Sequence, residues 1–358
     1  MRLRLHTSIV FLVWHVLAPA NQPLAAQATR RPAVPVEPIA AILDAFSSHS
    51  LVALSDAHGN NEAHEFLKTL IRHPRFASTV NDIVVEFGNA RYQHIVDRYL
   101  SGADLPLDSI RPAWQNTTIA NEIPVDEEFF TTVRRVNASL PRERQLRVLL
   151  SDPPIDWTVV RSRDDHFKWL SLRDSYPAAL IVTEVLAKQR RALVVYGHLH
   201  FQRKNVFSNL EMSDWRMQTI VSLLESSTPA TIFSIWRFAD EVRAVQPDAA
   251  SWPAPSLAVL RGTTLGAVDI TAFTPIPMRF QFEGERRVQV SRERWRNLRT
   301  EDQFDAVLYL GPSSAMTQTP LSATICADSS YVRERLRRIT LTGIPRAEAD
   351  RVTQLCAR

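Results

Sequence analysis

Short runs of apolar residues alternate with longer amphipathic stretches along most of this chain. Five runs have the length and the β-branched content of buried strands, and they cover residues 51–55, 83–87, 146–151, 192–197 and 231–238. The stretches between them repeat apolar residues at helical spacing; one of them, residues 163–189, is predicted to be a long helix that breaks at Pro177. Strands that alternate with helices predict an α/β fold, with a mainly parallel central sheet and helices on both faces.

The chain beyond the fifth run has a different character. Residues 240–300 are rich in Pro and Arg and have shorter apolar runs, so we expect an insertion or a flap over the strand ends. FDAVLYLGP, from Phe304, predicts a late buried strand that rejoins the sheet. We therefore expect one α/β domain over residues 36–320 and a C-terminal helical extension over residues 321–358.

Residues 1–28 have the pattern of a secretory signal peptide. Arg2 and Arg4 give a positive start, residues 8–18 are apolar, and residues 26–28 offer a small-x-small cleavage site. The apolar run is too short for a membrane anchor, since a span needs roughly 20 residues. The sequence predicts an exported protein, periplasmic or secreted, without a stable membrane span after cleavage.

The two cysteines, Cys326 and Cys356, both lie in the predicted C-terminal extension. Outside the cytoplasm, where the environment is oxidising, such a pair is expected to form a disulfide bond. The bond would pin the C-terminal helices; the alternative is two buried free thiols.

Composition and motifs exclude several classes of function. The net charge of +4 comes from scattered arginines without a basic stripe and interleaved aromatic residues, which argues against nucleic-acid binding. The 9 glycines form neither G-x-G-x-x-G nor G-x-x-x-x-G-K-[ST], so dinucleotide and P-loop chemistry are discounted. The G-x-S-x-G elbow of ordinary serine hydrolases is also missing from the sequence.

Polar residues follow three of the predicted strands at the same topological position. Asp56 and His58 follow the first strand, Glu86 ends the second, and His198 and His200 follow the fourth. Ligands of open α/β sheets bind outside the carboxyl ends of the strands, so we expect these side chains to form one site. His58 would act as a general base, oriented by Glu86, and the two later histidines would serve as acid, second base or metal ligands.

The helix predicted after Gly59 carries two more histidines. We interpret His64 and His73 as surface or capping residues. His64 is a minor second candidate for the site, because it lies close to His58 along the chain.

Part of this pattern resembles the calcineurin-like metallophosphoesterases. SDAHGN is similar to their opening D-x-H-G motif, and GHLH is similar to their closing G-H-x-H. That family also needs a G-D near the second strand and a G-N-H-[DE] after the third. Here Asn89 stands where the aspartate is wanted and G-N-H-[DE] is missing, so half of the metal ligands are lacking. This argues against the metallophosphoesterase interpretation.

Over residues 40–315 the chain resembles the erythromycin esterase-like superfamily, which includes the ChaN haem-uptake proteins and the Tiki/TraB branch. The similar segments are VALSDAHGNNEAHEFLKTLI, the strand-turn-helix opening; VVEFGNARYQHIVDRYLSG, with a strand ending in Glu; and RDSYPAALIVTEVLAKQRRALVVYGHLH, with a helix opened by Arg-Asp and a strand ending in a histidine pair. Ser55-Asp56 replaces the family's Gly-Glu, and aspartate is one methylene shorter.

The resemblance implies a hydrolase-like site whose residues are His58, Glu86, His198 and His200, with Asp56 and Arg173 in supporting positions. Esterase members activate water with a histidine, Tiki members cleave peptides with a metal, and ChaN members bind haem. We expect an exported hydrolase for a small-molecule ester or related carbonyl substrate, without a cofactor. The alternatives are a haem- or metal-binding uptake protein and a metal-dependent peptidase or phosphoesterase, with His58, Glu86 and His200 as ligands of a divalent metal.

Overall fold

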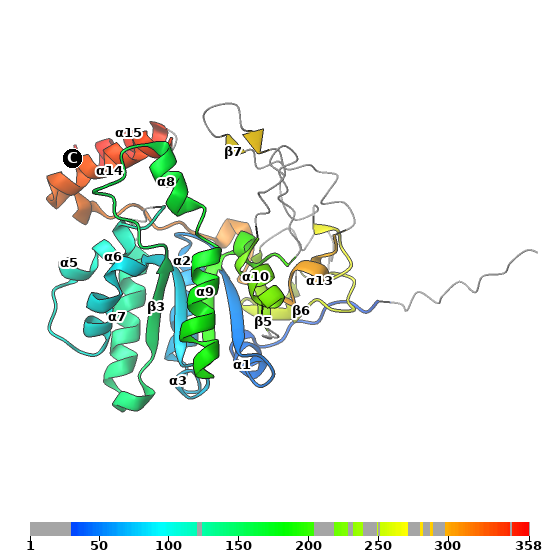
Figure 1. Cartoon of the computed structure of the whole chain (residues 1–358). Coiled ribbons are helices and arrows are strands. Elements are labelled where there is room, and N and C mark those ends of the chain that lie inside the picture. The colour runs from blue at the N-terminus through cyan, green and yellow to red at the C-terminus, as the bar shows by residue number, and fades with distance from the viewer. Residues whose placement is uncertain are drawn as a thin grey trace, which may run out of the picture. The chain divides into compact units, whose positions relative to one another are not determined.

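Seven strands form the central sheet of the computed structural model (Figure 1). They are β1 (Leu51–Asp56), β2 (Asp82–Asn89), β3 (Arg147–Asp152), β4 (Ala192–Gly197), β5 (Ile232–Phe238), β6 (Ser256–Val259) and β9 (Ala306–Tyr309). The structure describes residues 30–119, 124–203, 218–227, 232–238, 249, 251–270, 280–281, 287–288, 298–343 and 346–357. The predicted signal peptide lies outside these residues.

The strand order is β3-β2-β4-β1-β5-β9-β6. All neighbouring pairs run parallel except β6, which pairs antiparallel with β9 at the edge. The predicted α/β class with a mainly parallel sheet is therefore confirmed. A small hairpin of β7 (Phe280–Gln281) and β8 (Arg287–Val288) stands apart from the sheet.

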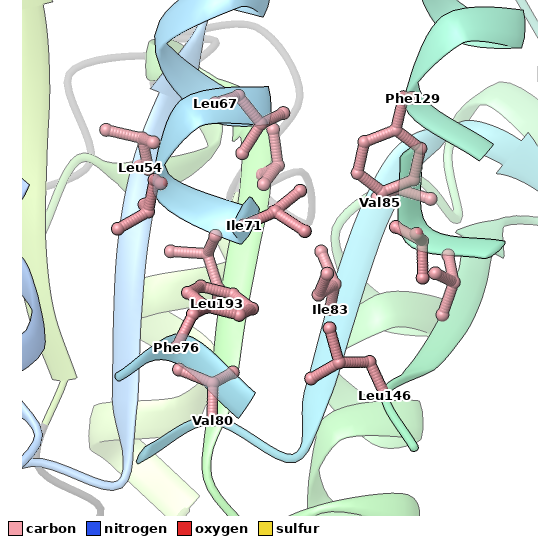
Figure 2. Close-up of a cluster of buried hydrophobic side chains, with 14 of the residues drawn as sticks. Leu54, Leu67, Ile71, Phe76, Val80, Ile83, Val85, Phe129, Leu146 and Leu193 are labelled. Carbon is pink, nitrogen blue, oxygen red and sulfur yellow. The ribbon is translucent and has the colours of Figure 1, made fainter. Parts of the chain in front are cut away.

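Alternate residues of β1 point into two different hydrophobic cores. Leu51 and Ala53 belong to one core, whereas Val52 and Leu54 belong to the other. This two-sided burial explains why the strand has an almost continuous apolar sequence, as central parallel strands do. Figure 2 shows part of the second core, in which Leu67 and Ile71 of a covering helix lie over the sheet.

Helices cover both faces of the sheet (Figure 1). The core that holds Val52 is covered by α1 (Pro38–Ala45), α2 (Asn61–Arg72), α3 (Phe76–Thr79), α4 (Gln93–Leu100), α5 (Leu107–Ile110), α6 (Pro112–Gln115) and α7 (Pro124–Ala138). The opposite core is covered by α9 (Ser175–Glu184) and α10 (Ile220–Ser227). The remaining helices are α8 (Arg163–Leu170), α13 (Thr300–Gln303), α14 (Ser329–Thr342) and α15 (Arg346–Cys356).

Two sequence predictions need correction. The helix expected over residues 163–189 is divided between α8 and α9, and Pro177 lies inside the first turn of α9, where its missing N–H has no intrahelical partner to lose. The flap expected over residues 240–300 is wrong for Ser256–Val259, because these residues are β6 and complete the sheet. The late strand predicted from Phe304 is confirmed as β9.

The C-terminal helices α14 and α15 pack on each other around Ile325, Ile339 and Val352. The predicted disulfide is present: the sulfur atoms of Cys326 and Cys356 are 2.03 Å apart. Residues 31–358 form one compact unit that includes these helices. In the part of the chain that the structure describes, no helix is long and apolar enough to span a membrane.

Candidate active site

The strand order brings the predicted polar residues together at the carboxyl ends of the strands. β2, β4 and β1 are neighbours, and the register pairs Asp56 at the end of β1 with Gly197 at the end of β4. Glu86 lies near the end of β2. Because these strands are parallel, their carboxyl ends carry Asp56, Glu86 and the segment that follows Gly197 to the same place.

His58 is held by the carboxylate of Asp56. Its Nδ1 atom is 2.7 Å from Oδ2 of Asp56, and its side chain is 54% exposed, whereas that of Asp56 is 6% exposed. Partial burial would lower the pKa of His58, but the charge of Glu86 and the hydrogen bond to Asp56 raise this pKa to about 9. Burial would likewise raise the pKa of Asp56, yet hydrogen bonds from His58 and His64 hold it well below its usual range.

Glu86 is the buried centre of the cluster. Its Oε2 atom accepts a hydrogen bond of 2.6 Å from the backbone N–H of Gly197, and its Oε1 atom accepts one from the guanidinium of Arg173. The Nε2 atoms of His200 and His58 lie 3.6 and 3.9 Å from the same Oε1 atom. Burial raises the pKa of Glu86, but the positive charges of Arg173 and His58 outweigh it and keep the group ionised.

Gly197 lets the backbone of β4 approach both of these side chains. A β-carbon at this position would lie 3.3 Å from Nε2 of His58 and 3.6 Å from Oε2 of Glu86. The first distance is tighter than ordinary van der Waals contact. Any larger residue would therefore press on the imidazole that faces Glu86.

His200 is the second cationic imidazole of the site. Its Nδ1 atom is 2.8 Å from Oδ1 of Asp174, which also accepts a hydrogen bond from the backbone N–H of Ile220. Burial lowers the pKa of His200, but the charge of Asp174 and a hydrogen bond to it raise this pKa to about 9. His200 is therefore protonated at neutral pH.

His198 lies in a different environment, although it was predicted to act with His200. It stacks on Trp236 with ring centroids 5.8 Å apart. Burial and the neighbouring charge of His200 lower the pKa of His198 to about 4. Its imidazole is neutral at physiological pH, so the two histidines of GHLH do not share one role.

Three carboxyl groups of this cluster were not recognised from the sequence. Asp152, at the end of β3, accepts a 2.7 Å hydrogen bond from the backbone N–H of Thr118 and lies 3.8 Å from Nε of Arg173. Burial raises its pKa to about 7. Asp174 holds His200, as described above. Asp126 of α7 is buried, and burial raises its pKa to about 8.

Our interpretation of His64 as a surface or capping residue is wrong. The residue is only 2% exposed, and its Nε2 atom lies 3.4 Å from Oδ1 of Asp56. It faces inward because α2 packs this side of the helix against the sheet, where the ring of His64 lies 6.1 Å from that of Phe87. The sequence does hold a signal for this orientation, because His64, Leu67 and Ile71 share one helix face at i, i+3 and i+7.

The site residues do not fit a divalent metal ion as they lie. Oε1 of Glu86 is the oxygen that faces both His58 and His200, and it is already bound by the guanidinium of Arg173. A fixed positive charge on this oxygen opposes a second cation. Among the described residues, no group of three or more His, Cys, Asp or Glu side chains could hold a metal.

Comparisons with known proteins give no family. No protein-family model and no curated protein matches this chain. Matching solved structures include a Bacillus cereus protein (11% identity, 81% of this chain and 97% of that chain, TM-score 0.47) and a succinoglycan biosynthesis protein (8%, 81% and 96%, 0.48). Another is the type III effector HopBA1 (13%, 59% and 88%, 0.36). The fold and the site themselves define an α/β protein with a histidine and carboxylate cluster at the strand ends.

Proposed function

We propose that this protein is an exported hydrolase of esters or related carbonyl compounds, with His58 as its general base. The observation that carries the proposal is the pairing of an exposed imidazole with a buried carboxylate. Asp56 accepts from Nδ1 of His58, so the ring carries its lone pair on Nε2 when it is neutral, and the pKa of about 9 makes the neutral ring the main form only at alkaline pH. A substrate or a water molecule can reach this imidazole from solvent, as a general base requires.

The chemical step needs one base and a site for developing negative charge. Water would lose a proton to Nε2 of His58 while its oxygen forms a bond to the carbonyl carbon. The carbonyl oxygen would gain negative charge, which His200 and Arg173, the cationic groups beside Glu86, would stabilise. When the carbon–oxygen bond to the leaving alcohol breaks, the imidazolium of His58 would return the proton to that alcohol.

The sequence resemblance to the erythromycin esterase-like superfamily supports the same chemistry, since its esterase members use a histidine without metal. Haem binding rests on the resemblance to ChaN proteins alone. The contact between Arg173 and Glu86 counts against a metal-dependent peptidase or phosphoesterase. The same fold can carry any of these functions. The proposal therefore rests on the geometry of the site.

Turnover of a panel of esters and lactones tests the proposal. We expect wild-type protein to hydrolyse at least one member, in the presence and absence of a chelator, and His58→Gln to be inactive while remaining folded. His94→Gln, at an exposed histidine of α4, is the matched control and should keep full activity. Full activity in His58→Gln, or activity that a chelator abolishes, would overturn the proposal.

A further inference from the structure

A polar cavity lies where the strands β2 and β3 begin, whereas the candidate active site lies at the carboxyl ends of the strands. Its volume is about 610 Å³, within the range of pockets that bind small molecules. It is formed where β2 and β3 begin at Asp82 and Arg147, whereas Asp56 and Glu86 lie at or near the carboxyl ends of their strands. No step of the proposed hydrolysis uses these residues.

Two of the arginines that line the cavity are held in place by one buried carboxylate. Asp82, with a side chain that is 0% exposed, accepts from Nε of Arg147 at 2.8 Å and from Nε of Arg190 at 2.7 Å. Each guanidinium also donates a second hydrogen bond to Asp82, through its Nη2 atom. Glu184 lies 3.3 Å from Nη1 of Arg147 but is also bound by Lys188. Two rigid cations therefore share one fully buried anion.

Two further arginines of the lining, Arg142 and Arg144, lie on the 3-10 turn Arg142–Arg144. Within the part of the chain that the structure describes, neither forms an ion pair with an acidic side chain. Glu143 is the carboxylate that lines the cavity directly. The four guanidinium groups of the lining thus outnumber the carboxylates beside them, Asp82, Glu143 and Glu184, which favours an anionic ligand.

The chemistry of the lining narrows the class of anion. A guanidinium presents a planar fork of donors that matches phosphate oxygens. Ser78, Asn81 and Gln145 add polar groups that can bind hydroxyls, and the lining contains no aromatic side chain on which a nucleobase could stack. We propose that this cavity binds a small phosphate ester of a hydroxyl-rich molecule, of the sugar phosphate class.

Isothermal titration calorimetry of the full chain with glucose 6-phosphate tests this site. We expect binding by wild-type protein, and affinity at least about tenfold weaker in the double variant Arg142→Gln/Arg144→Gln, since each arginine would contribute a charge-assisted hydrogen bond. The control double variant Arg98→Gln/Arg351→Gln removes the same charge from residues outside the cavity and should bind like wild type. Both replaced cavity arginines are exposed, so we expect an unchanged melting temperature.

Three results would overturn the inference: no binding of glucose 6-phosphate at millimolar concentrations, an equal loss of affinity in the two double variants, or binding of unphosphorylated glucose that is as tight as that of glucose 6-phosphate. Binding to phosphatidylglycerol vesicles without binding of glucose 6-phosphate would also overturn it, because a lipid surface would then be the partner. Ester hydrolysis should be the same in wild type and Arg142→Gln/Arg144→Gln. Failure of the hydrolase proposal and failure of this one are therefore distinguishable.

Discussion

The Oδ2 atom of Asp56 lies 2.7 Å from Nδ1 of His58, and these two residues differ sharply in their exposure to solvent. The other carboxylate oxygen of Asp56 faces Nε2 of the buried His64 at 3.4 Å. Asp56 is thus placed between an imidazole that can meet a substrate and one that cannot. In the proposed mechanism, this position lets Asp56 orient His58.

Replacing Asp56 by Asn should remove the negative charge beside His58 while keeping the size of the side chain. The amide can still contact Nδ1 of His58, but it no longer stabilises the imidazolium that forms during proton transfer. We expect kcat for the best ester to fall about 100-fold or more. Steady-state kinetics measure the effect, with Asp97→Asn, at an exposed residue of α4, as the control. An unchanged kcat in Asp56→Asn would show that this carboxylate does not act on His58.

Replacing Arg173 by Met should destabilise the folded protein. Arg173 is 12% exposed and lies beside the buried carboxylates of Glu86 and Asp152, which would lose their counterion. Breaking a buried ion pair in this way costs about 3–5 kcal/mol of unfolding free energy. Urea unfolding measures the change. In the control Arg91→Met, an exposed pair with Asp156 is lost, and we expect a cost of about 0–1 kcal/mol. Equal costs in the two variants would contradict the prediction.

Replacing Asp126 by Asn should change how stability depends on pH. Burial raises the pKa of this carboxyl to about 8, above its value in the unfolded chain. Below the pKa of about 4 that the carboxyl has in the unfolded chain, both states are protonated and the folded state keeps its full stability. Between this pH and pH 8 only the unfolded chain ionises, so the free energy of unfolding falls as the pH rises. The amide does not ionise, so Asp126→Asn should lose less stability between pH 5 and pH 8, by about 1 kcal/mol or more. Urea unfolding at both pH values measures the change, with Asp104→Asn, at an exposed residue, as the control. The prediction is wrong if wild type, Asp126→Asn and Asp104→Asn all show the same change in unfolding free energy between the two pH values.

The part of the site that could be predicted from the sequence is the part that follows a local pattern. Asp56, Glu86 and His200 each come at or just after the end of an apolar run, and parallel strands bring such ends together. Asp152 carries the same signal at the end of β3, so it could have been included with Glu86. Asp174 was visible only as the partner of Arg173 in a helix opening.

Other features depend on tertiary packing that leaves no local trace. The strand β6 is as short as β9, but it directly follows Pro255 in a stretch rich in Pro and Arg, and it is defined by its pairing with β9. His198 and His200 are two residues apart, but burial lowers the pKa of His198 whereas the charge of Asp174 raises that of His200, so the two imidazoles differ in charge.

Removing the disulfide in Cys326→Ser/Cys356→Ser should loosen the C-terminal helices without unfolding the sheet. The bond closes a loop with a sequence separation of 30, and loops of this length lose roughly 3–4 kcal/mol of stabilisation on opening. α14 also contacts the sheet domain through Arg338, whose Nη1 atom donates to Asn116 at 2.8 Å. Hydrogen exchange should accelerate in α14 and α15 and stay slow in β1 and β4. Unchanged exchange in α15 would contradict the prediction.

The pH dependence of kcat/KM tests the central claim most directly. The base form of His58 is neutral, and the charge-stabilising form of His200 is cationic; both groups have a pKa of about 9. We predict that kcat/KM for the best ester rises about tenfold per pH unit from pH 6, reaches a maximum near pH 9 and falls beyond it. A profile that is flat between pH 6 and pH 9, or that levels off near pH 6.5, would contradict His58 as the base in this electrostatic setting.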